Sequence, residues 1–320
     1  MDHAQDPWEP PPPYHDSRDF TPFRDPHVRT QVRGLAEGLG GAIYSALGGR
    51  ELDRISVVGD VPRLKRLSGK PAKAVHDAIF KGTAPDRLIA LARAYPGWAG
   101  LCTVMAGLLA YRQGSYLRAA ELLRRGLQTR IDDDASQFSA TYLTTVVTRV
   151  EVAERIEVPV LFSEESVFLA LSHCLRETGQ TKAALEALES LPPSLPTALA
   201  RCTAAAALGR HRDVINWTEG LLNANDLSAA LLLIRARSLR ALEMYGSAFD
   251  VLREVLRRRK TSLALRNDAL TDRALLALDV GRRALLPRRP VEVESKVDKH
   301  VEMHRLWDSD FKDLGGKGKD

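Results

Sequence analysis

Three side chains in the last 25 or so residues have the types and spacing of a metal site. His300 and His304 are four residues apart, so on a helix they would share one face, with Asp308 one turn further along it. Such a set could hold a divalent cation. Glu302 does not directly follow the first histidine, however, so the HExxH pattern of zinc proteases is absent. The surrounding sequence is highly charged, which favours a solvated helix over a metal centre.

The other patterns that could carry catalysis or bind a cofactor are incomplete. The carboxylates of Asp132 to Asp134 lack the alternating ligands, central glycine and final glutamate of a calcium loop, so we expect a solvated loop at a helix end. His173 precedes Cys174, but adjacent helical residues do not face each other. Neither GxSxG nor GxxxxGK[ST] occurs in the sequence. We therefore predict no catalytic residue, no metal, no cofactor and no enzyme activity.

The composition is that of an ordinary globular chain built largely from helices. Of 320 residues 44% are hydrophobic, which is enough to bury a sizeable core. Alanine, leucine and arginine dominate, and all three are good helix formers. The net charge of +5 is mild for this length. The richest basic run, Arg257 to Lys260, is typical of a helix end, where cations favour the negative end of the helix dipole.

The cysteines and the apolar runs predict a cytoplasmic protein. Cys102, Cys174 and Cys202 lie in apolar helical patterns, and none belongs to a CxxC motif, so we expect reduced core residues. The longest apolar run, Leu227 to Ile234, is far shorter than the roughly 20 residues that span a bilayer. The N-terminal residues contain no apolar segment of the kind that signal peptides carry. We predict no membrane insertion.

A repeating pattern of helix, tight turn and helix runs through the middle of the sequence. The first helices of the pairs are expected at residues 98–112, 164–177, 197–207 and 228–241. Matching positions in the second helices (Ala119, Ala184, Val214 and Ala248) are spaced by 65, 30 and 34 residues. The tetratricopeptide unit is 34 residues long. The sequence therefore predicts a mostly α fold, a tetratricopeptide-like α-solenoid over residues 85–286. Its last element is a degenerate pair or a single capping helix at about 263–286.

The 65-residue gap indicates an insertion between repeats. Residues 131–161 lack a helical pattern, and Val150, Val152, Ile156, Val158 and Val160 alternate with polar residues or proline. Alternation of β-branched residues is typical of strands. We predict an inserted β-hairpin at about 141–161, with its turn near Ala153 and Glu154.

The regions flanking the solenoid have less regular patterns. Residues 1–27 are proline-rich and expected to be disordered, although Pro11 to Tyr14 match the PPxY pattern that WW domains bind. Residues 28–84 are expected to be mixed or helical, with a short strand at 55–58 and one or two basic helices within 62–80. In the tail at 287–320, Trp307, Phe311 and Leu314 predict a short helix that either caps the last repeat or binds another protein.

Part of the chain resembles a known family. From Arg155 to about Gly220 the order is a strand with Pro159, a helix, the motif ALEALESLP (184–192), a helix and the motif RHRDVI (210–215). This order resembles the N-terminal repeat domain, with its β-finger, of EccA-type AAA+ ATPases of type VII secretion in actinobacteria. The ATPase half of that family has no counterpart here. The resemblance implies a partner-binding repeat domain and transfers no catalytic residue.

The predicted register of the repeats places six polar side chains on the concave inner face of the solenoid: Tyr111, Arg112, His173, Arg176, Arg237 and Arg240. Because a guanidinium grips a carboxylate with two parallel hydrogen bonds, this face would suit an acidic or C-terminal peptide. The alternative is that the arginines only keep the surface soluble.

These patterns predict a non-catalytic adaptor or scaffold that binds a protein or peptide, and the family resemblance links it to type VII secretion. The alternatives are a structural subunit of a larger assembly, or a regulator that contacts nucleic acid through residues 62–81 or 253–289. The sequence predicts no particular oligomeric state.

Overall fold

The computed structural model describes residues 56–57, 60–65, 69–82, 84–258 and 261–285. By its contacts the chain divides into two units, Met1–Leu276 and Ala277–Asp320, and the described part of the second unit is the end of one helix. The predictions for residues 1–55 and 286–320 fall outside the described residues. They include the proline-rich N-terminus, the His300, His304 and Asp308 set and the C-terminal helix. The predicted domain boundaries stay predictions.

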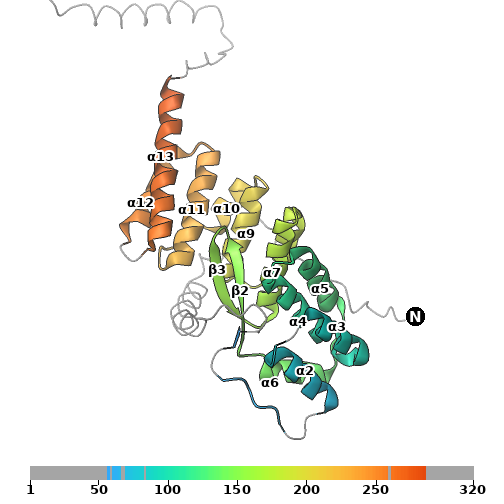
Figure 1. The fold of residues 1–320 in the computed structure, drawn as a ribbon. Helices are drawn as coiled ribbons and strands as arrows, with labels where there is room; N and C mark the ends of the chain where they lie inside the picture. The colour runs from blue at the N-terminus through green and yellow to red at the C-terminus, as the bar shows by residue number, and fades with distance from the viewer. Residues whose placement is uncertain (1–55, 58–59, 66–68, 83, 259–260, 286–320) are drawn as a thin grey trace, which may run out of the picture. The chain divides into compact units, whose positions relative to one another are not determined.

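Four helix–turn–helix pairs follow one another in the described part of the first unit (Figure 1). The four pairs are α4 (Ala99–Arg112) with α5 (Tyr116–Gln128), α7 (Glu164–Glu177) with α8 (Thr181–Ala187), α9 (Leu195–Ala207) with α10 (His211–Trp217), and α11 (Asp226–Ala241) with α12 (Tyr245–Arg257). In order along the chain, the first helices α4, α7, α9 and α11 each contact the next. A further helix, α13 (Leu263–Leu285), follows α12. The predicted mostly α solenoid with an inserted hairpin is confirmed.

Two of the first helices begin at reciprocal side-chain caps. At α7 the Ser163 side chain accepts from the Ser166 N–H, and the Ser166 hydroxyl accepts from the Ser163 N–H at 3.1 Å. Asn225 and Ser228 make the same exchange at α11. Each exchange satisfies backbone donors that the first turn of a helix leaves unpaired. The starts of these helices are therefore specified by local sequence.

The turns inside three of the four pairs depend on glycine. Gly114, Gly179 and Gly209 follow the first helices and have φ values of +73°, +77° and +73°. This left-handed conformation costs glycine little, because it has no Cβ. In the first pair the N–H of Ser115 then donates to the carbonyl of Ala110 at 3.0 Å, which satisfies a carbonyl at the helix end.

The fourth turn has a glutamate where the others have glycine. Glu243 follows α11 with φ +60°. Because a side chain in this conformation costs about 1 kcal/mol, we expect Glu243→Gly to raise the free energy of unfolding by about that amount. Urea denaturation measures the change. Gly179→Ala is the matched control and should lower stability by a similar amount. A Glu243→Gly midpoint equal to that of wild type would mean that this turn stores no strain.

The elements before the first pair are short. β1 (Ser56–Val57) lies within the strand expected at 55–58, and one helix, α2 (Lys70–Phe80), occupies the region expected to hold one or two. α3 (Pro85–Ala94) and the 3-10 turn η1 (Pro96–Trp98) lead into α4, and both contact it.

The prediction that residues 131–161 contain no helix was wrong, because α6 (Asp133–Tyr142) lies there. Asp132 immediately precedes the helix, and two further aspartates occupy its first turn, where negative charge favours the positive end of the helix dipole. Ala135, Phe138 and Tyr142 are buried at helical spacing. The carboxylate run therefore starts a short amphipathic helix, which the alternating pattern downstream obscured.

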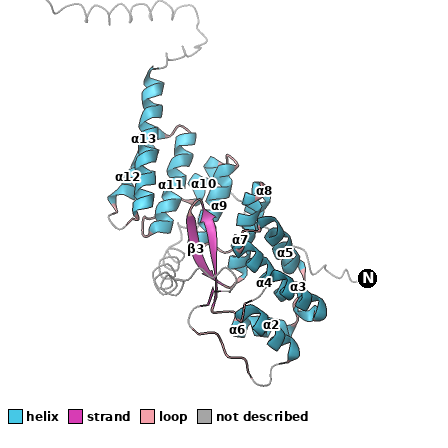
Figure 2. Ribbon diagram, in the orientation of Figure 1, coloured by secondary structure: helices cyan, strands magenta, loops and turns pink. Residues whose placement is uncertain are grey.

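The inserted hairpin forms most of a three-stranded antiparallel sheet in the order β1-β2-β3. Its two long strands are magenta in Figure 2. β2 (Val146–Ala153) pairs with β3 (Ile156–Leu161), and Val150 lies opposite Val158. The turn between them holds Arg155 at φ +61°. The predicted hairpin is confirmed, with its turn one residue later than expected.

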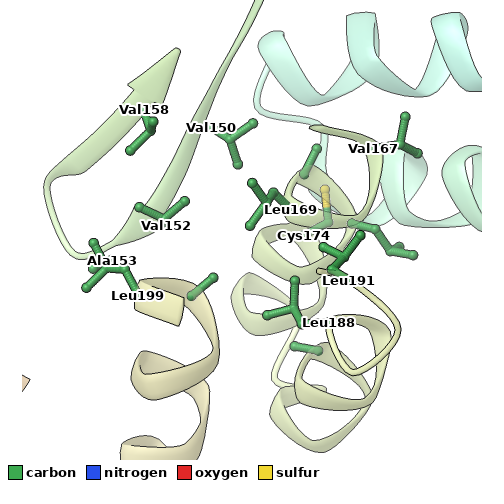
Figure 3. Close-up of a cluster of buried hydrophobic side chains, with 14 of the residues drawn as sticks. Val150, Val152, Ala153, Val158, Val167, Leu169, Cys174, Leu188, Leu191 and Leu199 are labelled. Carbon is green, nitrogen blue, oxygen red and sulfur yellow. The ribbon is translucent and has the colours of Figure 1, made fainter. Parts of the chain in front are cut away.

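The hairpin packs against first helices of the solenoid. β2 contacts both α7 and α9. Val150 and Val152 are buried in a cluster with Leu169 of α7 and Leu199 of α9 (Figure 3). The alternating valines therefore pack the hairpin onto α7 and α9.

Candidate functional site

Tyr111, at the end of α4, connects the solenoid to the hairpin. Its hydroxyl oxygen accepts the backbone N–H of Glu151 in β2 at 3.1 Å. The same oxygen lies 2.8 Å from Nδ1 of His173 in α7. Its ring packs at tilted or edge-on angles against the rings of Tyr116 and His173. One buried hydroxyl therefore joins two helices and a strand.

The surroundings of His173 indicate a neutral imidazole. The carboxylates that face Nε2 only accept hydrogen bonds, so the neutral ring is assigned its proton on Nε2, and Nδ1 then accepts from the Tyr111 hydroxyl. Nε2 lies 3.5 Å from Glu177 and 3.9 Å from Glu151. The ring is 3% exposed. Burial, with a contribution from the charge of Arg176, lowers the pKa of His173, and the two carboxylates oppose this shift.

Arg176 also binds the hairpin. Its Nη1 donates to the backbone carbonyl of Val152 at 2.9 Å, at the irregular end of β2 where the register shifts. We call Tyr111, His173 and Arg176 the hairpin clamp. The structure brings these three predicted site residues together, and each contacts the hairpin through a hydrogen bond or a carboxylate. Arg112 follows Tyr111 in the chain and is half-buried. Binding of a partner by these residues stays a prediction.

Arg237 and Arg240 lie in a second place, near the end of α11. The Arg237 Nε donates to Oδ2 of Asp272 in α13 at 2.7 Å. The Arg237 side chain is 51% exposed, whereas Asp272 is nearly buried. Burial raises the pKa of Asp272, and the charge of Arg237 opposes that shift. Arg237 therefore pairs with a carboxylate of the chain itself. Binding of a partner's carboxylate by Arg237 and Arg240 stays a prediction.

The surface around this ion pair is only slightly hollowed. Arg237, Arg240 and Asp272 line the hollow together with Ala236, Leu252 and Leu276. It has no room to enclose a small molecule.

Sequence reasoning missed Asp272 and the internal role of the hairpin. Asp272 lies three residues after Ala269 and four before Leu276, and both of these are buried. A carboxylate on the apolar face of a helix is the signal that could have found it, because buried charges require a partner. The hairpin carried no comparable signal, since its hydrogen bonds to Tyr111 and Arg176 use the backbone N–H of Glu151 and the backbone carbonyl of Val152.

The described residues contain no group of three side chains placed to hold a metal. The helices within the described ranges also include none that is both long and apolar enough to cross a bilayer.

The three cysteines are expected to be unreactive in the native protein. Cys102, Cys174 and Cys202 are buried, and burial raises the pKa of each thiol to about 12. Because the thiolate is the reactive form, Ellman's reagent at pH 8 should react with all three only after unfolding in urea. Rapid release of colour from the native chain would contradict the expectation that the three thiols are unreactive in the folded protein.

A solved structure similar to this chain comes from a secretion ATPase. No family model and no curated protein matches the sequence. The structure is the N-terminal domain of the EccA1 ATPase from the ESX-1 secretion system of Mycobacterium tuberculosis, with 17% sequence identity and a TM-score of 0.46. The match covers 62% of this chain and 73% of that one. That domain belongs to the family that the sequence resemblance indicated.

Proposed function

We propose that this protein is a non-catalytic adaptor or scaffold that binds a protein or peptide through its helical repeats. The observation that carries the proposal is the half-exposed Arg237 of α11, which already holds the carboxylate of Asp272 at 2.7 Å. A guanidinium has five donors in a planar fork, so one carboxylate does not exhaust its capacity. Arg240 lies beside it. An acidic segment of a partner is the complementary ligand.

The sequence resemblance adds a class of partner to this proposal. Residues 155–220 resemble EccA-type proteins, so components or substrates of a type VII secretion system are the first partners to test. No nucleotide-driven step forms part of the proposal.

Reversing the charge of both arginines should weaken partner binding. Arg237→Glu alone would set two carboxylates side by side, so the test variant combines Arg237→Glu and Arg240→Glu with Asp272→Arg, which restores the internal ion pair in reverse. Tagged full-length protein is used to recover partners from lysate of the source organism. A recovered protein is then titrated calorimetrically. We expect about a tenfold or greater loss of affinity in the triple variant.

Asp272→Asn is the matched control, because it removes the ion pair and keeps both arginines. It should bind as wild type does. Equal binding by the folded triple variant would exclude this surface. Recovery of nucleic acid, with an affinity that falls steeply as salt rises, would instead favour a regulator.

A further inference from the structure

The outward side of α13 is apolar although it is exposed. Leu263 is 75% and Leu270 is 52% exposed, and Ala274 is also at the surface. These residues are spaced by seven and four positions, so they form one stripe along about three turns of the helix. The opposite side carries the buried residues Leu265 and Ala269. We call Leu263, Leu270 and Ala274 the α13 stripe.

The order of the repeats indicates what kind of element covers such a stripe. Helices α4, α7, α9 and α11 each pack against the second helix of their own pair. The second helices use small and aliphatic side chains for this contact, as Ala248, Leu252 and Val255 of α12 show by their burial. In chain order α13 stands where the first helix of a further pair would begin, and the described residues include no second helix for it. A helix is therefore the element whose shape the stripe fits.

The charges beside the stripe select the character of that helix. Arg266 and Arg273 are seven residues apart and follow one edge of the stripe. Neither guanidinium has an ion-pair partner among the described residues. Two unpaired arginines beside an apolar surface complement a row of carboxylates. Antiparallel pairing with a second copy would instead bring the two arginine rows together.

We propose that the α13 stripe, with Arg266 and Arg273, is a docking surface for an acidic amphipathic helix of a partner protein. The partner helix places aliphatic side chains on Leu263, Leu270 and Ala274 and carboxylates beside the two arginines. This surface is separate from Arg237 and Arg240, so the inference goes beyond the proposed function and can fail without it.

The test uses two synthetic helical peptides of about 18 residues, each with one leucine stripe. One peptide has glutamates flanking the stripe and the other has lysines. Binding to the full-length chain is followed by fluorescence anisotropy. The glutamate peptide should bind wild type about tenfold or more tightly than the lysine peptide, and Arg266→Glu with Arg273→Glu should reverse that preference. Leu270→Asp should weaken binding of the glutamate peptide about tenfold.

Arg253→Glu with Arg257→Glu on α12 is the control for an equal change of net charge and should leave both affinities as in wild type. Equal binding of the two peptides, or no binding of either, would overturn the proposal. Self-association that Leu270→Asp abolishes would assign the stripe to a second copy instead. Binding seen only after removal of residues 286–320 would assign it to the chain's own C-terminal residues.

Discussion

Gly126→Ala is expected to lower the free energy of unfolding by about 3 kcal/mol, although alanine is the better helix former. Gly126 lies in α5 where that helix crosses α4. A Cβ on this residue would lie 2.8 Å from the backbone nitrogen of Val104 and 2.6 Å from its Cγ2. It would also lie 3.2 Å from the carbonyl oxygen of Gly100. A backbone atom cannot rotate away, so the helices themselves must separate.

Separation of α4 and α5 would loosen the most deeply buried helix of the fold. Almost every residue of α4 is buried. On the same crossing, a Cβ on Gly107 would lie 2.8 Å from the side chain of Leu123. Moving α5 outward to admit one methyl group therefore weakens contacts along the whole pair. The cost of this overpacking exceeds the gain of about 1 kcal/mol in helix propensity.

Gly246→Ala is the matched control, because it makes the same substitution at a helical glycine with no atom within 4 Å of the added Cβ. This variant should be equal to wild type or more stable by about 0.5 kcal/mol. Urea denaturation of both variants, with unchanged m-values, measures the difference. Equal midpoints for the two variants would show that α4 and α5 do not cross as closely as the structure has them.

The sequence predicted that α4 and α5 pack against each other but not how closely they approach. The repeat pattern paired the helix expected at residues 98–112 with a second helix that contains Ala119. Helical periodicity and local caps are short-range signals, so α7 was predicted with both ends correct at Glu164 and Glu177. The distance at which two helices pack depends on every side chain between them, and periodicity carries no such information.

The candidate site was predictable only in part for a related reason. Periodicity placed Tyr111, Arg176 and Arg237 on the face of the first helices, but it could not show which distant segment covers that face. The structure joins Tyr111 to Glu151, Arg176 to Val152 and Arg237 to Asp272. Two of these three contacts involve backbone atoms of the hairpin, which leave no trace in residue types.

A substitution in the hairpin clamp, Tyr111→Phe, is expected to lower the stability of the fold. Tyr111→Phe keeps the ring and removes the hydroxyl that serves both the Glu151 N–H and His173 Nδ1. Because the Glu151 N–H and His173 Nδ1 then lose their hydrogen-bond partner in a largely buried site, we expect the free energy of unfolding to fall by about 2 kcal/mol. Tyr116→Phe is the control from the same ring cluster. The Tyr116 hydroxyl bonds to no described residue, so its removal should change stability by less than about 0.5 kcal/mol.

A titration separates loss of the hydroxyl from general loosening of the fold. The pKa of His173 is lowered in the folded chain, whereas the unfolded chain takes up this proton near pH 6.5. The contribution of His173 to stability is therefore complete above about pH 6.5 and is lost as pH falls through the lower folded value. In wild type, the hydrogen bond from the Tyr111 hydroxyl to Nδ1 stabilises the neutral ring, and Tyr111→Phe removes it. The pKa of His173 should therefore move upward in this variant. The loss of stability below about pH 6.5 should then shrink. NMR titration of the His173 ring reports the pKa directly. A destabilised Tyr111→Phe protein with an unmoved His173 pKa would mean that the hydroxyl supports the hairpin through Glu151 alone.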